Sequence, residues 1–191
     1  FYLDILKDRL YTFKKDGLGR RSAQTAMWES LTVLVRIIAP IVPFTAEEIW
    51  QYLAKGQNAE SVHLADWPRA NTKYIDTELE NKWYNLIQFR TKVLKLLEEK
   101  RASGEIGSSL EAKVVIGINP DNAFLRDFKE VLPEVLIVSA VSLEEASAGE
   151  PYINVSKAPG TKCPRCWNYS ERIGESGMYP DICPKCVKAL T

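Results

Sequence analysis

Histidine is nearly missing from this chain, and cysteine is missing from its first 162 residues. The one histidine, His63 in the stretch SVHLADW, has no serine or cysteine partner suggested by its neighbours. Nucleophilic catalysis of the triad type needs such a partner. A glycine-rich loop that could cradle phosphate is absent as well. These absences predict that the chain has no catalytic centre of its own and acts by binding.

Long apolar runs and an excess of one charge are also absent. No apolar run approaches the roughly 18 residues of a membrane span, and no secretory signal peptide opens the chain. The chain begins with FYLD, which is already amphipathic and lacks an initiator methionine, so we expect a piece of a longer protein with no membrane partner. Basic and acidic residues balance at 25 each, which argues weakly against a nucleic-acid partner.

The even balance hides an uneven distribution of charge along the chain. Residues 111–156 carry 3 basic and 8 acidic side chains, whereas residues 157–191 carry 6 basic and 3 acidic ones. An acidic segment is therefore followed by a basic tail. Because the tail has a local excess of positive charge, a nucleic acid remains possible as its binding partner.

All four cysteines, Cys163, Cys166, Cys183 and Cys186, lie in the last thirty residues. Their C-x2-C-x16-C-x2-C spacing is typical of a four-thiolate zinc site. Two disulfides are the rival interpretation, but a disulfide framework normally spreads through a small secreted domain. Since the protein would supply all four ligands, no coordination position stays open for substrate. We therefore expect one structural Zn²⁺.

The rest of the sequence predicts helices first. Apolar residues recur at steps of three and four through the first 53 residues, which is typical of buried helix faces. In the stretch PFTAEEIW, Thr45 can cap the next helix while Glu48 reaches back, and Phe44 would pack on Ile49. The positions expected on the buried face of the helix before this corner are Ala23, Met27, Leu31, Leu34, Ile37 and Ile38.

A long helix is expected from about residue 76 to 102, and the period changes after it. EAKVVIGI alternates like a strand, Asn119-Pro120 opens a short helix that Pro133 closes, and VLIVSAVSL indicates a second strand. A further extended stretch, YINVS, leads into the cysteines. The predicted fold class is multi-domain, α plus α/β. The expected domains are a helical bundle over residues 1–108, a small α/β domain over 109–156 and a four-cysteine zinc finger over 157–191.

The basic tail also carries aromatic side chains. Trp167 and Tyr169 lie close in sequence to Lys162, Arg165 and Arg172. Cations for phosphates and aromatic faces for unstacked bases are what the recognition of single-stranded RNA needs. The alternative is that Trp167 packs beneath the metal as the core of this small segment.

A second basic cluster, made of Lys14, Lys15, Arg20 and Arg21, flanks the glycine-containing corner between the first two helices. Such side chains are most often solvated surface. The alternative is a contact with phosphate, for which Arg20 and Arg21 are the candidates.

Four stretches carry a resemblance to a known family. FYLDILKDRLY and LVRIIAPIVPFTAEEIW resemble the anticodon-binding helical bundle of the class I synthetases for isoleucine, valine, leucine and methionine. EIGSSLEAKV resembles the junction after that bundle in the isoleucine enzyme, and KCPRCWNY followed by CPKC resembles its terminal zinc-binding domain. In this order the four stretches resemble the C-terminal part of bacterial-type isoleucyl-tRNA synthetase over essentially the whole chain.

The resemblance implies a cytoplasmic, monomeric ligase that uses ATP to join isoleucine to tRNA(Ile). The anticodon stem-loop would lie against the part of the enzyme that this chain represents. The catalytic and editing domains would belong to the same polypeptide, because the adenylation motifs His-x-Gly-His and Lys-Met-Ser-Lys-Ser are absent from this sequence. The family pattern places zinc on the four cysteines and a tryptophan directly after the second one, so Trp167 is expected to contact the anticodon loop.

Two other functions stay open at this point. DNA glycosylases of the formamidopyrimidine type end in a similar four-cysteine finger, so a DNA-binding zinc module is one alternative. The other is a structural or protein-docking domain in which zinc only closes the end of the chain.

Overall fold

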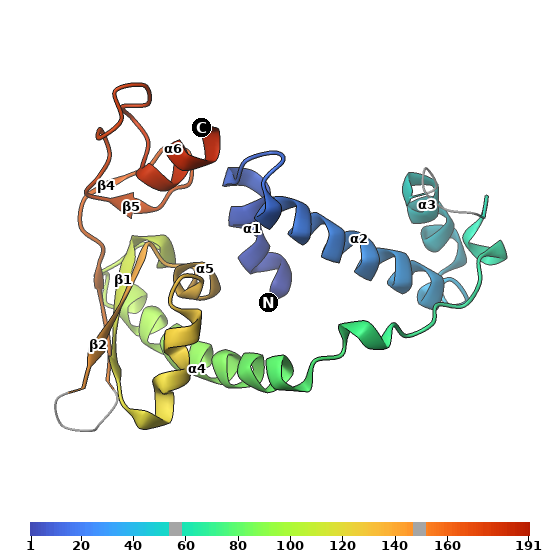
Figure 1. Cartoon of the computed structure of the whole chain (residues 1–191), viewed down its shortest axis with the longest axis horizontal. Helices are drawn as coiled ribbons and strands as arrows, with labels where there is room; N and C mark the ends of the chain where they lie inside the picture. The colour runs from blue at the N-terminus through green and yellow to red at the C-terminus, as the bar shows by residue number, and fades with distance from the viewer. Residues whose placement is uncertain (54–58, 147–151) are drawn as a thin grey trace. The chain divides into compact units, whose positions relative to one another are not determined.

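The computed structural model describes residues 1–53, 59–146 and 152–191. The chain divides into two compact units, and Figure 1 labels most of the helices and strands of both. One unit is Lys15–Asp76, and the other combines Phe1–Lys14 with Thr77–Thr191. Within the described ranges, no helix has both the length and the apolar character needed to cross a membrane.

The unit Lys15–Asp76 is helical. It contains α2 (Leu18–Ile38), α3 (Pro43–Leu53) and the single turns η2 (Val62–Leu64) and η3 (Thr72–Tyr74). Its core is formed by Val35 of α2, by Ala39 directly after that helix, by Ala46 and Trp50 of α3, and by Val62 of η2. The turn after α3 is thus packed onto the two helices and belongs to their core.

The corner between α2 and α3 differs from the prediction. α3 begins at Pro43, so Thr45 lies inside the helix and the predicted capping box is wrong. Proline suits the first helical position because the N–H that it lacks would have no partner there. The predicted packing of Phe44 on Ile49 is also wrong, since Phe44 is 89% exposed.

The predicted buried face of α2 is only partly buried. Ala23 is buried as expected, but Leu31, Leu34 and Ile37 are 38%, 52% and 42% exposed. The side chains that α2 buries are Ala23, Thr32 and Val35. Periodicity identifies an apolar stripe on a helix, but only tertiary contacts decide how much of it is covered.

The second unit contains a three-stranded sheet with the order β2-β1-β3. The central strand β1 (Ala112–Ile118) pairs in parallel with β2 (Ala140–Glu145) and antiparallel with β3 (Ile153–Lys157). In this register Val114 lies opposite Val141 on one side and Val155 on the other. The crossover from β1 to β2 contains η5 (Pro120–Phe128) and α5 (Leu132–Leu136).

The second strand begins later than VLIVSAVSL predicts. The residues at the start of that stretch, Val135 and Leu136, belong to α5, and Ile137 follows in the left-handed region at φ 57°. Pro133 lies in the first turn of α5 and does not close a helix. Strand pairing therefore starts only at Ala140.

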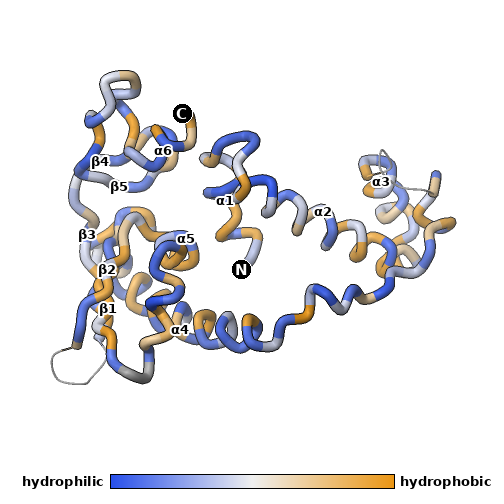
Figure 2. The backbone as a smooth tube through the Cα atoms, in the orientation of Figure 1, coloured by the Kyte–Doolittle hydropathy of each residue, from blue (hydrophilic) through white to orange (hydrophobic). Residues whose placement is uncertain are grey.

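The long helix α4 (Thr77–Ala102) agrees with the predicted range and packs on the sheet. Its residues Leu86, Val93 and Leu97 share one core with β1 and α5. Figure 1 shows α4 running alongside these elements, and Figure 2 shows hydrophobic residues concentrated in β1 and α5. This core is the largest in the described chain.

Two helices, one single turn and two short strands complete the described part of this unit. They are α1 (Tyr2–Thr12), η4 (Ser109–Glu111), β4 (Thr161–Lys162), β5 (Tyr169–Ser170) and α6 (Pro184–Leu190). α1 lies against α5, where Arg9 forms an ion pair with Glu134 at 2.9 Å. The first helix of the chain is therefore part of the unit that also contains its last residues.

Candidate metal centre and nucleic-acid interface

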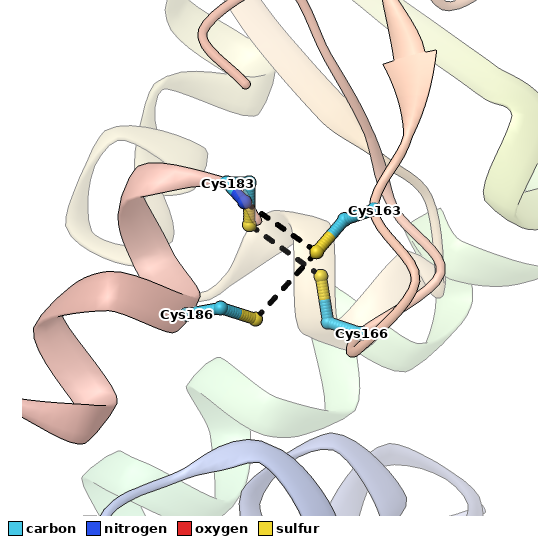
Figure 3. A group of neighbouring side chains, drawn as sticks. All are labelled: Cys163, Cys166, Cys183 and Cys186. Carbon is cyan, nitrogen blue, oxygen red and sulfur yellow. Dashed lines mark hydrogen bonds between the residues drawn. The ribbon is translucent and has the colours of Figure 1, made fainter. Parts of the chain in front are cut away.

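The four cysteines converge on one point. Cys163 and Cys166 lie in a tight turn after β4, while Cys183 precedes α6 and Cys186 lies in its first turn. Figure 3 shows the four side chains pointing toward a common centre, and all four sulfur atoms lie within 4.8 Å of one another. We call residues 160–189, which contain this cluster, the four-cysteine segment.

The distances between the sulfurs fit a metal site and not disulfides. The Sγ atoms of Cys166 and Cys183 are 3.6 Å apart, and those of Cys163 and Cys186 are 3.9 Å apart. A disulfide needs about 2.05 Å, and all four residues are free cysteines. Zinc–sulfur bonds of about 2.3 Å in a tetrahedron place the sulfurs roughly 3.8 Å apart. The donor set therefore fits a closed zinc site.

Burial and backbone hydrogen bonds shift the pKa values of the cysteine thiols in opposite directions. Burial opposes ionisation of Cys163, but backbone N–H groups of Cys166, Cys183 and Arg165 donate to its sulfur and lower its pKa to about 6. Burial raises the pKa of Cys186 to about 11 and that of Cys166 further still. Several thiolates this close repel one another unless a metal ion neutralises them.

Backbone hydrogen bonds close the first turn of the segment. The N–H of Trp167 donates to the Cys163 carbonyl, and the N–H of Cys163 donates to the Asn168 carbonyl, both at 2.9 Å. This closure holds Trp167 in the left-handed region at φ 66°. A bulky residue is strained there, and such strain persists only where the surroundings enforce it.

Trp167 does not form the core beneath the cysteines. Its side chain is 60% exposed, and the apolar side chains packed on the cysteines are Ile173 and Ile182. The packing alternative is therefore wrong. The Nζ atom of Lys162 lies 5.2 Å from the centre of the Trp167 ring, which is cation–π geometry.

The other basic candidates lie in different surroundings. Arg165 donates to the carbonyl of Thr12 at 2.5 Å. Arg172 pairs with Glu175 at 2.7 Å on the surface. Arg20 and Arg21 belong to α2 in the other unit, where Arg21 is exposed and Arg20 is partly buried. Of the candidates in the tail, Lys162 and Trp167 are in contact with each other.

A cavity of about 490 Å³ lies beside Trp167. Its wall includes residues of α1, the first residues of α5 and those directly after it, the turn from Arg165 to Asn168, and Lys185 of α6. Its volume is within the range of small-ligand pockets. Ile137 and Trp167, the two non-glycine residues with positive φ in the described chain, both line it. Strained residues gather at functional sites, so this wall is a candidate binding surface.

Sequence reasoning missed the contribution of the first helix to this site. Asp4, Asp8 and Tyr11 of α1 line the cavity, together with Ile137. Nothing in the sequence signals this, because α1 and the four-cysteine segment stand at opposite ends of the chain. The contact exists only through the tertiary fold.

Comparison with known proteins agrees with the geometry. Residues 1–116 match the family model described as the anticodon-binding domain of tRNA ligase. The chain belongs to this family. Residues 160–189, the four-cysteine segment, match a second family model, described as the zinc finger found in FPG and IleRS.

The relatives are isoleucine–tRNA ligases, as the resemblance implied. The chain is 41% identical over 206 residues to the ligase of Natranaerobius thermophilus and 44% identical over 192 residues to that of Caldicellulosiruptor saccharolyticus. It is 43% identical over 203 residues to the ligase of Moorella thermoacetica. These matches cover 99–100% of this chain but 21–22% of the relatives. The chain thus spans about a fifth of their length.

Proposed function

We propose that this chain is the part of an isoleucine–tRNA ligase that binds the anticodon stem-loop of tRNA(Ile). The family match and the names of the relatives support this assignment. The catalytic and editing domains lie elsewhere in the same polypeptide, and the catalytic domain uses ATP to join isoleucine to the tRNA. The full-length ligase acts as a cytoplasmic monomer, and this part of it binds RNA without forming a product.

One observation carries the proposal. Trp167 is exposed in a strained backbone conformation beside Lys162, at the edge of a cavity. An exposed ring offers a stacking surface to an unstacked base, and the neighbouring ammonium attracts the phosphate backbone. The cavity has room for a base that leaves the stack of the loop.

The metal has a structural role in this proposal. Cys163, Cys166, Cys183 and Cys186 hold one Zn²⁺, which supplies folding energy to the segment. Because the protein supplies all four ligands, no position is open for a substrate. The segment therefore positions Trp167 and carries out no chemical step.

The basic side chains divide by their availability. Lys162, Arg172, Arg20 and Arg21 are our candidates for phosphate contacts, although Arg172 would first have to leave its ion pair with Glu175. Arg165 is less available, because its guanidinium already donates to the Thr12 carbonyl. Arg165 therefore remains a candidate only for a phosphate contact that it can make while it keeps this hydrogen bond.

We also propose the functional division into a bundle over residues 1–108, a junction over 109–156 and a zinc-binding domain over 157–191. The compact units divide the chain differently, because α1 packs in the same unit as α5 and the four-cysteine segment. The division by function and the division by packing differ at the first helix. In this proposal α1 belongs to the helical bundle by function, but it packs in the unit that contains the four-cysteine segment.

The replacement of Trp167 by alanine tests the proposal. We expect Trp167→Ala to weaken binding to the isoleucine tRNA by about 1–3 kcal/mol, because one base loses its stacking partner. Zinc content should stay unchanged, since the side chain lies outside the core of the segment. Binding is measured by fluorescence anisotropy of labelled tRNA, and zinc by mass spectrometry.

Trp67→Ala is the matched control. Trp67 is 64% exposed, nearly as much as Trp167, but belongs to the other unit. Its loss should leave affinity unchanged. Equal losses in both variants, or unchanged affinity in Trp167→Ala, would contradict the proposed role of Trp167.

Duplex DNA serves as the competitor that separates the alternatives. The anticodon-domain match and the isoleucine–tRNA ligase relatives do not favour a DNA-binding module. We expect tRNA, and not duplex DNA, to displace the labelled tRNA. If the chain ignored all nucleic acid at low salt, it would be a structural or protein-docking domain instead.

A further inference from the structure

The last helix of the chain is docked on the first. Lys185 of α6 forms an ion pair with Asp8 of α1, although the two residues are 177 positions apart. The hydroxyl of Thr12 donates to the same carboxylate at 2.8 Å. The Lys185 ammonium also lies 5.8 Å from the ring centre of Phe13. One cation is thus held by a carboxylate and an aromatic face at the end of α1.

Arg165 adds a second contact at the same place. Its guanidinium donates to the carbonyl of Thr12, the last residue of α1. The carbonyls of the last helical turn have no partner within the helix, and positive charge is favourable there. Arg165 itself lies between Cys163 and Cys166 in the first Cys-x-x-Cys turn. Arg165 therefore connects the cysteine cluster directly to α1.

A third contact holds the segment on the sheet side. The backbone N–H of Tyr169 donates to the hydroxyl of Ser139 at 2.6 Å, and that hydroxyl donates to the Leu110 carbonyl. This contact is a single chain of hydrogen bonds. On the side of the segment that faces α1, the contacts are those of Lys185 and Arg165.

The cysteine cluster cannot set this orientation. Four sulfurs around one ion determine the internal structure of the segment, but none of them contacts α1 by a hydrogen bond or an ion pair. Trp167 and α1 line the same cavity. A rotation of the segment relative to α1 would therefore change the shape of the cavity while the metal site stayed intact.

We propose that the C-terminal end of α1 is the platform that orients the four-cysteine segment, with Asp8 and Lys185 as positioning residues for Trp167. This inference rests on the proposed RNA-binding function of Trp167. The docking itself does not depend on RNA, so it can be measured without any ligand.

A charge swap in the 191-residue chain tests the platform. Asp8→Lys places two ammonium groups together, and Lys185→Asp places two carboxylates together. We expect each single variant to keep its zinc, to bind the isoleucine tRNA roughly 3- to 30-fold more weakly, and to exchange the amide hydrogens of residues 160–170 faster. The double variant, with the pair reversed, should regain slow exchange and most of the affinity.

Asp8→Lys separates positioning from direct contact with RNA. It adds positive charge, so simple attraction to phosphate predicts tighter binding, whereas loss of docking predicts weaker binding. Tighter binding with unchanged exchange would overturn the proposal, and so would unchanged values of both. If Asp8→Lys lost its zinc, the nearly isosteric Asp8→Asn would carry the same test.

Arg101→Glu is the control variant. Arg101 forms an exposed ion pair with Glu98 at 2.9 Å on α4, away from this contact. Its reversal should change neither exchange in residues 160–170 nor tRNA affinity. If the swap restores slow exchange but the unmodified chain binds no tRNA, the platform stands and the proposed function fails. If amide exchange in residues 160–170 is the same in all the variants, the proposed role of α1 as a platform is wrong.

Discussion

Two short irregular segments of this chain each present an exposed tryptophan, and they are anchored in different ways. Trp167 belongs to the four-cysteine segment, and Trp67 follows residues 59–66 in the other unit. Their side chains are 60% and 64% exposed. The comparison shows two solutions to one problem, which is to hold a segment that has little regular structure.

The four-cysteine segment relies on its sulfurs. Beyond the buried cysteines, the partly buried apolar side chains packed on the cluster are Ile173 and Ile182. So small a core cannot offset the conformational entropy that a chain of this length loses on folding. We therefore expect metal binding to supply most of the stability of this segment.

Residues 59–66 are held by hydrogen bonds with side chains of α3. Trp50 donates from its Nε1 atom to the Ala59 carbonyl at 3.0 Å. The Glu47 carboxylate accepts from the Ser61 hydroxyl at 2.7 Å and from the Val62 N–H at 3.0 Å. Each of these anchors is modest, and none requires an ion. The stability of residues 59–66 is thus spread over several contacts, whereas that of the four-cysteine segment depends mainly on the binding of one metal ion.

Removal of zinc should have the largest effect and should reach only one of the two segments. We expect a chelator, or Cys183→Ser, to unfold residues 160–189 with a loss of about 10 kcal/mol or more. Residues 59–66 should keep their slow amide exchange. Hydrogen exchange followed by mass spectrometry measures both in one sample. Equal loosening of both segments would show that they do not differ as described.

Trp50→Phe should have an intermediate effect on the second segment alone. Trp50 is 1% exposed, and its replacement removes one hydrogen bond and some buried volume. We expect a loss of about 1–3 kcal/mol in the free energy of unfolding, measured by urea denaturation with zinc content unchanged. Trp67→Phe is the control, because an exposed ring loses little. Similar losses in the two variants would contradict the assigned anchor.

Acid should have the smallest effect, through Glu47. The hydrogen bond from Ser61, with further ones from Gln51 and Val62, lowers the pKa of Glu47 below its ordinary value of 4.5. A carboxyl with a lowered pKa in the folded state stabilises the fold above its ordinary pKa. This contribution is lost as the pH falls through the lower, folded-state pKa.

The expected result is that exchange at Ser61 and Val62 speeds up below about pH 4.5. In Glu47→Gln, exchange at these positions should already be faster at neutral pH and should depend less on pH. The pH profile is measured between pH 3 and 7, with intrinsic exchange rates taken into account. A profile that is identical in both proteins would remove Glu47 from the list of anchors.

The sequence predicts the cysteine cluster well because its information is local. Each Cys-x-x-Cys pair needs only a tight turn, and the short stretch between Cys166 and Cys183 brings the pairs together. The long helix α4 is predicted well for a similar reason, since its periodicity continues over many residues. Local chemistry does not depend on distant packing.

The corners of the fold are predicted less well. Thr45 resembles a helix cap in the sequence, but Pro43 begins the helix earlier. The stretch around Val135 has the composition of a strand, yet its first residues end a short helix before Ile137. At such boundaries two local preferences compete, and contacts with the rest of the protein choose between them.

By itself the sequence determined which residues can bind a metal, where the main helices run and which family the chain resembles, because spacing and periodicity are properties of neighbouring residues. Only the tertiary structure decided that Trp167 is exposed and that Asp8 meets Lys185. The second outcome depends on a contact between opposite ends of the chain. No local pattern encodes such a contact, since it forms only when α1, α5 and the four-cysteine segment pack together.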